Sequence, residues 1–302
     1  MHIFVDQQDM KLAQRKFLFL LLVISLAACH SATSQPAGSD HAQASAGNTS
    51  QRNSASSNKT SGRNPGRLIH VIVALCDNEY QGIVPVPASL GDGDDPQTNL
   101  YWGAGYGVKS FFKRSKDWAL ISETRNPRPA VLERCVFKLK GQDVYMVADA
   151  YRGREIRQSI IDFLSYAAGV SSEPVEIVWN SKHLSLNGGG GSDLIAYVGH
   201  DGLMDFQLAE YPQQADEHPR DAIILACASK SYFDKPLRRT GANPLLWTTG
   251  LMAPEAYVLK AAVDGWLLHE SGEQVRRRAA QAYNQYQSCG MKAAMNLFSN
   301  GR

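Results

Sequence analysis

The sequence has little charge and none of the residue clusters that mark proteins which bind nucleic acids or metals. Charged residues make up 20% of its 302 positions, and the formal net charge is only +2. No basic stripe with interleaved aromatic residues is present, so we expect no nucleic-acid partner. The five cysteines form neither a CxxC motif nor a Cys/His group with metal-ligand spacing. We therefore expect no metal and no cofactor.

Two glycine-rich segments also lack the residues that would give them a ligand. Residues 187–192 contain a run of glycines, but neither a Lys-Ser/Thr pair nor a helix follows directly, as a phosphate-binding loop requires. Residues 91–96 resemble part of a calcium-binding loop but lack the glutamate at its twelfth position. We expect residues 91–96 to form a turn and residues 187–192 to form a flexible lip beside the functional site.

Residues 1–28 have the organisation of a secretory signal peptide. Basic residues precede an apolar core at residues 17–26, which is too short for a comfortable membrane span. The sequence LAAC that ends at Cys29 resembles a bacterial lipobox, which implies cleavage before Cys29 and attachment of a lipid such as palmitate. The lipid bilayer would then be a partner of this protein, through the anchor at Cys29. The alternative is an ordinary signal peptide with an incidental Cys29.

Residues 29–66 are expected to be a disordered linker between the lipid anchor and the folded domain. Residues 30–66 are rich in Ser, Ala, Asn, Gly and Gln and contain no large apolar residue, so they cannot bury surface to offset the entropy of ordering. The residue directly after Cys29 is His30 and not Asp. By analogy with other lipoproteins, this favours the outer membrane of the cell envelope. The folded domain is then residues 67–302.

The pattern of apolar residues in this domain predicts an α/β fold with a mostly parallel central sheet flanked by helices. Short apolar runs without polar alternation are typical of strands buried on both faces, and they occur at residues 67–76, 194–198 and 222–225. Further strands are expected at residues 130–140, 143–150, 174–179 and 243–250. Helical spacing predicts helices at residues 100–118, 154–168, 253–269 and 273–288.

Two of the buried strands are followed by residues that can carry out chemistry. His200 follows the run at residues 194–198, and Cys227 follows the run at residues 222–225. The carboxyl ends of parallel strands meet at one edge of a sheet, where ligands bind. A thiol and an imidazole at that edge can form an activated nucleophile. A helix that begins near Ser229 would direct free N–H groups toward Cys227 and favour an oxyanion.

An apolar block that ends in His near Gly, followed by a block that ends in Ala-Cys, resembles the caspase–legumain–gingipain superfamily of cysteine peptidases. The resemblance implies a caspase-like three-layer sandwich, with His200 and Cys227 as the catalytic dyad. The protein would then be a lipid-anchored cysteine hydrolase of the cell envelope, acting on a protein or peptide substrate. In this family Gly usually follows the His directly, whereas here Asp201 intervenes before Gly202.

Two other functions are consistent with the same fold. A domain that kept its pocket and lost catalysis would be an envelope binding or scaffold lipoprotein, and the inserted Asp201 is the feature that most favours this alternative. A small-molecule hydrolase or transferase on a doubly wound sheet is the other. Because an exported protein with four further thiols could form two disulfides, a Cys227 held in a disulfide would end the catalytic interpretation.

Several polar residues near the expected site are candidates for substrate contacts. The candidates are Asp77 and Asn78 after the first strand, Asp201, Gly202 and Asp205 around His200, and Thr249 at the end of a later strand. Asp77 and Asn78 could equally cap a turn, whereas Asp201 and Asp205 could orient His200 or attract a basic group. Backbone N–H groups at Cys227 and near Gly202 are expected to stabilise an oxyanion. The three acids together hint at a substrate with Arg or Lys before the cleaved bond.

Overall fold

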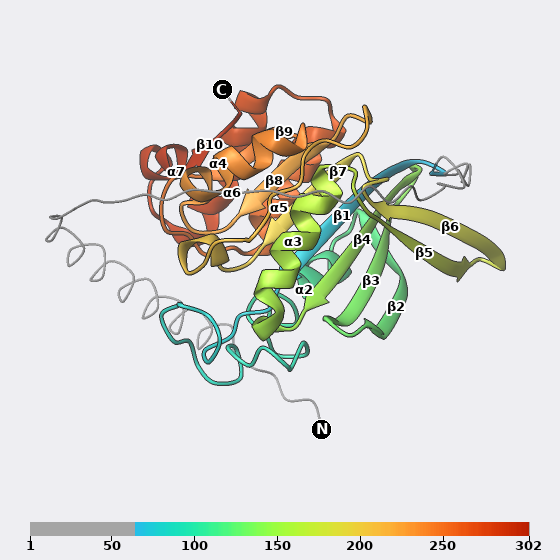
Figure 1. Cartoon of the computed structure of the whole chain (residues 1–302), viewed down its shortest axis with the longest axis horizontal. Coiled ribbons are helices and arrows are strands. Elements are labelled where there is room, and N and C mark those ends of the chain that lie inside the picture. The colour runs from blue at the N-terminus through green and yellow to red at the C-terminus, as the bar shows by residue number, and fades with distance from the viewer. Residues whose placement is uncertain (1–63, 302) are drawn as a thin grey trace, which may run out of the picture. The chain divides into compact units, whose positions relative to one another are not determined.

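The computed structural model describes residues 64–301, which form a mostly parallel mixed sheet flanked by helices (Figure 1). The main sheet has eight strands in the order β10-β9-β8-β7-β1-β4-β3-β2. The predicted α/β class is therefore confirmed. The signal peptide expected at residues 1–28, the Cys29 expected to carry a lipid and most of the linker expected at residues 29–66 lie outside the described residues.

The parallel part of the sheet consists of the strands that the apolar runs predicted. They are β1 (Arg67–Ala74), β4 (Val144–Tyr151), β7 (Leu194–Val198), β8 (Asp221–Leu225) and β9 (Asn243–Thr248). β1 lies between β4 and β7, and β8 lies between β7 and β9, all in parallel pairs. Every residue of β7 is buried. Since helices cover both faces, a strand here has no need of alternating polar residues.

Antiparallel strands extend the sheet at both sides. β2 (Trp118–Arg128) and β3 (Val131–Leu139) continue it beyond β4, and the short β10 (Phe298–Ser299) pairs with β9. A separate two-stranded sheet, β5 (Ser172–Trp179) with β6 (Lys182–Gly189), extends outward beside β2 and β3 (Figure 1). The predicted strand at residues 174–179 thus exists, but outside the main sheet.

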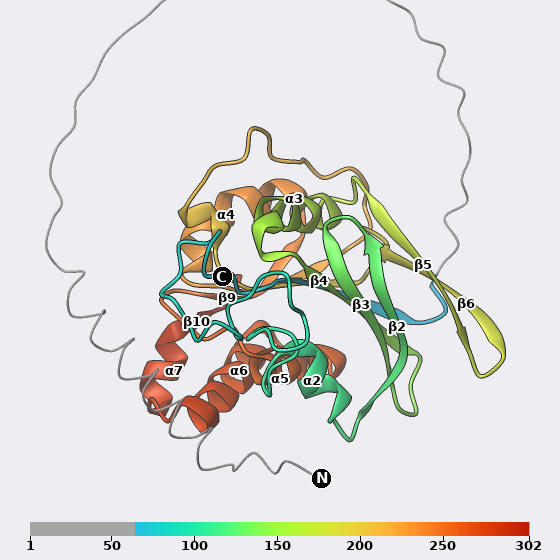
Figure 2. The same cartoon turned by 90° about the horizontal axis from the view of Figure 1, so that it is seen from below.

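The helices form a layer on each face of the main sheet. Figure 2 shows α3 and α4 on one face and α2, α5 and α6 on the other. The core under α3 and α4 includes Tyr197 of β7, Ile224 of β8, and Phe163 and Phe233 of the two helices. The helices and 3₁₀ turns are α2 (Val108–Lys113), η1 (Gly153–Glu155), α3 (Ile156–Ala167), η2 (Gly202–Met204), α4 (Ser229–Thr240), α5 (Ala256–Leu267), α6 (Gly272–Gln287) and α7 (Met291–Leu297).

Two sequence predictions are corrected. The helix expected at residues 100–118 is confined to α2, because the segment before it contains three glycines and folds as successive turns, and Trp118 already begins β2. The glycine run at residues 187–192 is not a lip beside the site. Its first part belongs to β6, and the rest lies directly before β7, at the amino end of that strand, whereas His200 follows the carboxyl end.

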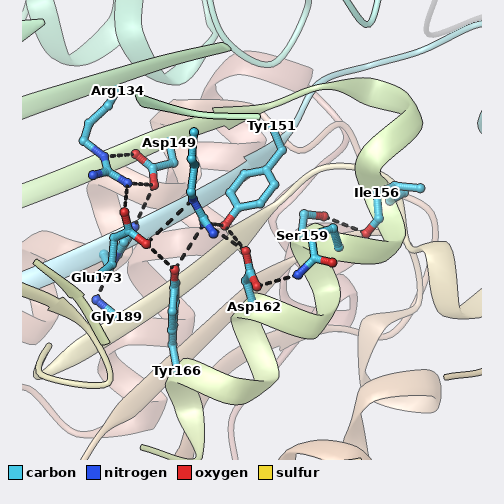
Figure 3. A network of polar contacts seen from close by, with 12 residues as sticks. Arg134, Asp149, Tyr151, Ile156, Ser159, Asp162, Tyr166, Glu173 and Gly189 are labelled. Carbon is cyan, nitrogen blue, oxygen red and sulfur yellow. Dashed lines mark hydrogen bonds and ion pairs between the residues drawn. The ribbon is translucent and has the colours of Figure 1, made fainter. Parts of the chain in front are cut away.

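A network of buried charges ties the sheet to α3 and to the β5–β6 hairpin (Figure 3). Arg134 of β3 binds the fully buried carboxylate of Asp149 through Nε and Nη2, at 2.6 and 2.7 Å, and its Nη2 also lies 2.7 Å from Glu173 of β5. His70 lies 3.2 Å from Asp149, and the Gly189 N–H donates to the other His70 ring nitrogen. Burial alone would raise the pKa of Asp149, but the hydrogen bonds from Arg134 and His70 outweigh it and hold that pKa below its ordinary value.

Candidate functional site

The sheet brings His200 and Cys227 to the same edge, as the sequence predicted. β7 and β8 are parallel neighbours, and Val198 pairs with Leu225 in their register. His200 lies two residues beyond Val198, and Cys227 lies two residues beyond Leu225. Both residues therefore leave the sheet at the same level, where the carboxyl ends of open α/β sheets usually bind ligands.

Asp205 orients the His200 ring. The Nε2 atom of His200 lies 2.7 Å from Oδ2 of Asp205, and the His200 residue is only 8% exposed. Since a carboxylate only accepts hydrogen bonds, Nε2 carries a proton. The other ring nitrogen, Nδ1, has no hydrogen-bond partner between residues 64 and 301, and it is the atom left to act as a base. Of the two roles predicted for Asp205, the geometry supports orientation of His200.

Cys227 stands in a sharp turn between β8 and α4. The next residue, Ala228, has a left-handed backbone conformation with φ of +48°, and its N–H donates to the Gly250 carbonyl at 2.9 Å. The side chain of Ser229 reaches back to the Ile224 carbonyl, at 3.0 Å. The turn is thus fixed by bonds to β8 and to the segment after β9, which holds the Cys227 thiol in one place.

The Cys227 thiol is free and partly buried. Its Sγ atom accepts a hydrogen bond from the Met252 N–H at 3.4 Å, and the other cysteines of residues 64–301, at positions 76, 135 and 289, are free as well. The alternative that a disulfide blocks Cys227 is therefore not met in this structure. Burial raises the pKa of Cys227, the Met252 N–H lowers it, and the charge of Asp201 adds to the rise.

No hydrogen bond joins His200 to Cys227 within the part of the chain that the structure describes. His200 is held by Asp205 and Cys227 by Met252, on adjacent loops of one sheet edge. Contacts between a nucleophile and its base are often loose before substrate binds. The arrangement therefore provides the two groups at one edge, with the thiol neutral at rest.

The other cysteine near this edge has a different environment. Cys76 follows β1, is fully buried and lies beside the Tyr101 hydroxyl. Burial raises the pKa of Cys76 to about 12, so this thiol is not a nucleophile at neutral pH. Sequence reasoning named neither Tyr101 nor Met252 as part of the site. Tyr101 lies in the segment that was predicted to be a helix at residues 100–118, and Met252 lies in the irregular segment between β9 and α5.

Most of the remaining predicted site residues use their polar side-chain atoms in hydrogen bonds within the protein. One oxygen of Asp77 accepts the N–H groups of Glu79 and Tyr80, at 2.9 and 3.0 Å, so Asp77 caps a turn. Asn78 exchanges two hydrogen bonds with the backbone of Val86. The Thr249 hydroxyl donates to the Asn296 carbonyl at 2.6 Å and thereby anchors α7.

The N–H groups predicted to form an oxyanion site near Gly202 are also engaged. The Gly202 N–H donates to the His200 carbonyl at 3.1 Å, and the Leu203 N–H donates to the Asp201 side chain at 3.1 Å. These bonds form the 3₁₀ turn that carries Asp205 toward His200. The glycine at this position avoids a clash, since a Cβ would lie 2.8 Å from the Phe206 ring. The role of this segment is therefore to position His200.

Asp201 is a buried acid with an unused oxygen. The residue has no exposed surface, and Oδ2 has no hydrogen-bond partner among residues 64–301. Burial raises the pKa of Asp201 to about 7, the Leu203 N–H opposes the rise, and the charge of Asp205 adds to it. A carboxyl group in this environment is more stable when it is protonated.

Asp201 is expected to make the domain less stable as the pH rises from about 4 to about 7. Its pKa is higher in the folded state than the usual 3.8, so the neutral form stabilises the fold below about pH 4, and this contribution is lost as the group ionises toward pH 7. Each unit of pKa shift corresponds to about 1.4 kcal/mol. Urea denaturation of the full chain at pH 4–8 should show that Asp201→Asn flattens this decline. An unchanged pH dependence in the variant would contradict the assignment.

A comparison of the chain with known protein families, with curated proteins and with solved structures finds no match. The function must therefore be inferred from the residues of the site. His200 and Cys227 lie at a common level on adjacent parallel strands, and His200 contacts Asp205.

Proposed function

We propose that the folded domain is a caspase-like cysteine hydrolase that cleaves peptide bonds, with Cys227 as the nucleophile and His200 as the general acid–base. The observation that carries this proposal is the position of both residues at the carboxyl ends of the adjacent strands β7 and β8, at matched register. The three-layer arrangement of helices around a mostly parallel sheet is consistent with the resemblance of the two motifs to the caspase–legumain–gingipain superfamily.

The proposed reaction begins with a neutral thiol. His200 Nδ1 takes the proton from Cys227, and the resulting thiolate attacks the peptide carbonyl carbon to form a C–S bond. The protonated imidazole then gives the proton to the leaving amine as the C–N bond breaks. Water hydrolyses the thioester, which releases the acid product and restores the thiol. Asp205 stabilises the imidazolium that forms between the two proton transfers.

The negative charge that develops on the carbonyl oxygen requires donors beside Cys227. α4 begins two residues after Cys227. The N–H groups of Ser229 and Ser231 donate to the Thr248 hydroxyl and to the Ala228 carbonyl, so the donors that support an oxyanion site at this turn are the Cys227 and Lys230 N–H groups. The Gly202 segment is left out of this role, since its N–H groups are already bonded.

A binding or scaffold protein without catalysis is the second candidate function. Two observations favour it: burial raises the pKa of Cys227, and no hydrogen bond joins this thiol to His200 in the described chain. In that case the site edge would hold a peptide segment without cleaving it. The two candidates differ in whether Cys227 reacts and not in where the segment binds.

Digestion of a peptide library by the full chain tests the proposal. We expect cleavage products in mass spectra, and we expect treatment of the protein with iodoacetamide to abolish them in proportion to the modification of Cys227. Pre-incubation with the reagent at a level that modifies only the exposed Cys289 should leave cleavage intact. A library that stays uncleaved, or cleavage that survives full modification of Cys227, would favour the binding protein.

We also propose that the protein is a lipoprotein anchored through Cys29 at the outer membrane, with the domain carried on a linker. The lipobox-like sequence before Cys29 supports this proposal. No helix within residues 64–301 is both long and apolar enough to cross a bilayer. Metabolic labelling with radioactive palmitate should mark the wild-type chain and leave Cys29→Ser unlabelled, whereas equal labelling would argue against the anchor.

A further inference from the structure

We infer, on the basis of the proposed function, that the segment bound at Cys227 carries large apolar side chains and not the basic residue that the nearby acids suggested. The observation is an apolar rim around the site edge. Its members are Tyr80, Met204, Tyr232 and Leu251, whose exposed fractions are 54, 40, 39 and 48%. Apolar side chains gathered on a surface around a reactive group are typical of a binding site.

Each rim residue comes from a different segment beyond the carboxyl end of a parallel strand. Tyr80 follows β1, Met204 follows β7, and Leu251 follows β9. Tyr232 lies in the first turn of α4, the helix that follows Cys227. Four separate segments thus each expose one large apolar side chain at the edge where the nucleophile stands.

Contacts between neighbouring loops bring these segments together. The Gly82 N–H, in the loop of Tyr80, donates to Asp205, one residue after Met204, at 3.3 Å. The turn η2, which contains Met204, packs against α4, which contains Tyr232. The N–H of Met252, one residue after Leu251, donates to the Cys227 sulfur at 3.4 Å. The four segments are therefore neighbours at the site edge, and the segment that carries Leu251 contacts the thiol through Met252.

Of the acids at this edge, the three that the sequence suggested as contacts for a basic side chain are engaged or buried, whereas the exposed Glu79 interacts with the Tyr80 hydroxyl. Asp77 caps its own turn, and Asp205 accepts from both His200 and Gly82. Asp201 has no exposed surface. A lysine or arginine of a substrate would have to share these carboxylates with the donors that they already accept from. An apolar segment would instead cover the rim and remove its apolar surface from water, which favours binding.

Two covalent probes with the same reactive group test this inference on the full chain. The benzyloxycarbonyl chloromethyl ketones of phenylalanine and lysine each alkylate a thiol. The methylene carbon of the reagent forms a C–S bond as chloride leaves and the thiol proton is lost. Mass spectrometry follows this addition at Cys227. We expect the phenylalanine probe to react at least ten times faster than the lysine probe. Equal rates, or a faster lysine probe, would overturn the inference.

Variants of the rim give the matched comparison. Met204→Ser with Leu251→Ser should slow the phenylalanine probe at least tenfold, since both side chains would lose their apolar contact with the probe. The same change should leave alkylation of Cys227 by iodoacetamide, which needs no side-chain contact, unaltered. Leu268→Ser is the control, since Leu268 is 64% exposed but follows α5, whose end binds Arg67 at the opposite edge of the sheet. A rim variant that behaves like this control would contradict the inference.

A second measurement separates the failure of this inference from the failure of the proposed hydrolase. Cys227→Ala cannot react, so fluorescence anisotropy can measure its binding of a fluorescein-labelled pentapeptide with two phenylalanines, against the matched peptide with two lysines. Tighter binding of the phenylalanine peptide supports the apolar preference even where Cys227 proves unreactive. No preference between the peptides overturns it, whatever the state of the thiol.

Discussion

Replacement of Cys227 by serine is expected to reduce peptide cleavage by the full chain about a thousandfold or more. A hydroxyl group is much harder to deprotonate than a thiol, and a base positioned for the larger sulfur atom does not compensate. When catalytic residues act together, removal of the nucleophile alone loses most of the rate enhancement of the enzyme. The measurement is the rate of appearance of the products identified in the peptide library.

Cys289→Ser is the matched control for this change. Cys289 is exposed and lies between α6 and α7. Its substitution should leave the cleavage rate unchanged. If Cys227→Ser and Cys289→Ser both cleave like the wild type, the nucleophile is not Cys227, and the activity belongs to another group.

Replacement of Arg134 by methionine is expected to destabilise the domain by about 3–5 kcal/mol, because it leaves a buried carboxylate without its main partner. Asp149 has no exposed surface and takes two hydrogen bonds from the Arg134 guanidinium. The remaining partner, His70, is fixed by the Gly189 N–H so that one ring N–H faces Asp149. One neutral donor cannot replace a guanidinium that binds through two atoms.

Urea denaturation of the full chain at pH 7 measures this effect, with Arg238→Met as the control. Arg238 makes an ion pair with Asp234 on α4, at 2.9 Å, but the Arg238 side chain is 57% exposed, and pairs of this kind contribute less than about 1 kcal/mol. The paired state holds the pKa of Asp149 below its ordinary value. Its contribution is therefore present above about pH 4 and is lost as the pH falls further. Equal destabilisation by the two substitutions would contradict the role assigned to the network.

The strands of the parallel sheet were predictable because burial on both faces leaves a simple signal. Runs such as Leu194–Val198 and Asp221–Leu225 are almost entirely apolar, and they are strands in the structure. β2 was missed because it lies at the sheet border, with a mixed burial pattern that includes exposed charged residues. β6 was missed because its last residues are glycines, which the sequence suggests are loop residues.

The candidate site was predictable where it depends on strand ends and was not predictable where it depends on loops. The positions of His200 and Cys227 follow from the ends of β7 and β8. The choice between orienting His200 and binding substrate was open for Asp205, because it depends on a 3₁₀ turn that the sequence does not signal. The capping role of Asp77 was offered as an alternative, and local hydrogen bonding favours it. The apolar rim could not be predicted, because it forms where four segments meet in the fold and has no periodic pattern in the sequence.

The most direct test of the central claim is the pH dependence of iodoacetamide alkylation at Cys227, compared between the wild-type chain and His200→Ala. Peptide mass spectrometry follows each cysteine separately, and the exposed Cys289 should react at the same rate in both proteins. If His200 is the base for this thiol, the wild type should alkylate Cys227 about tenfold faster at pH 7, and the difference should shrink as the pH approaches the raised pKa of the Cys227 thiol, where hydroxide removes the proton directly. Identical rates for Cys227 in the two proteins at every pH would contradict the claim that His200 and Cys227 work as a pair.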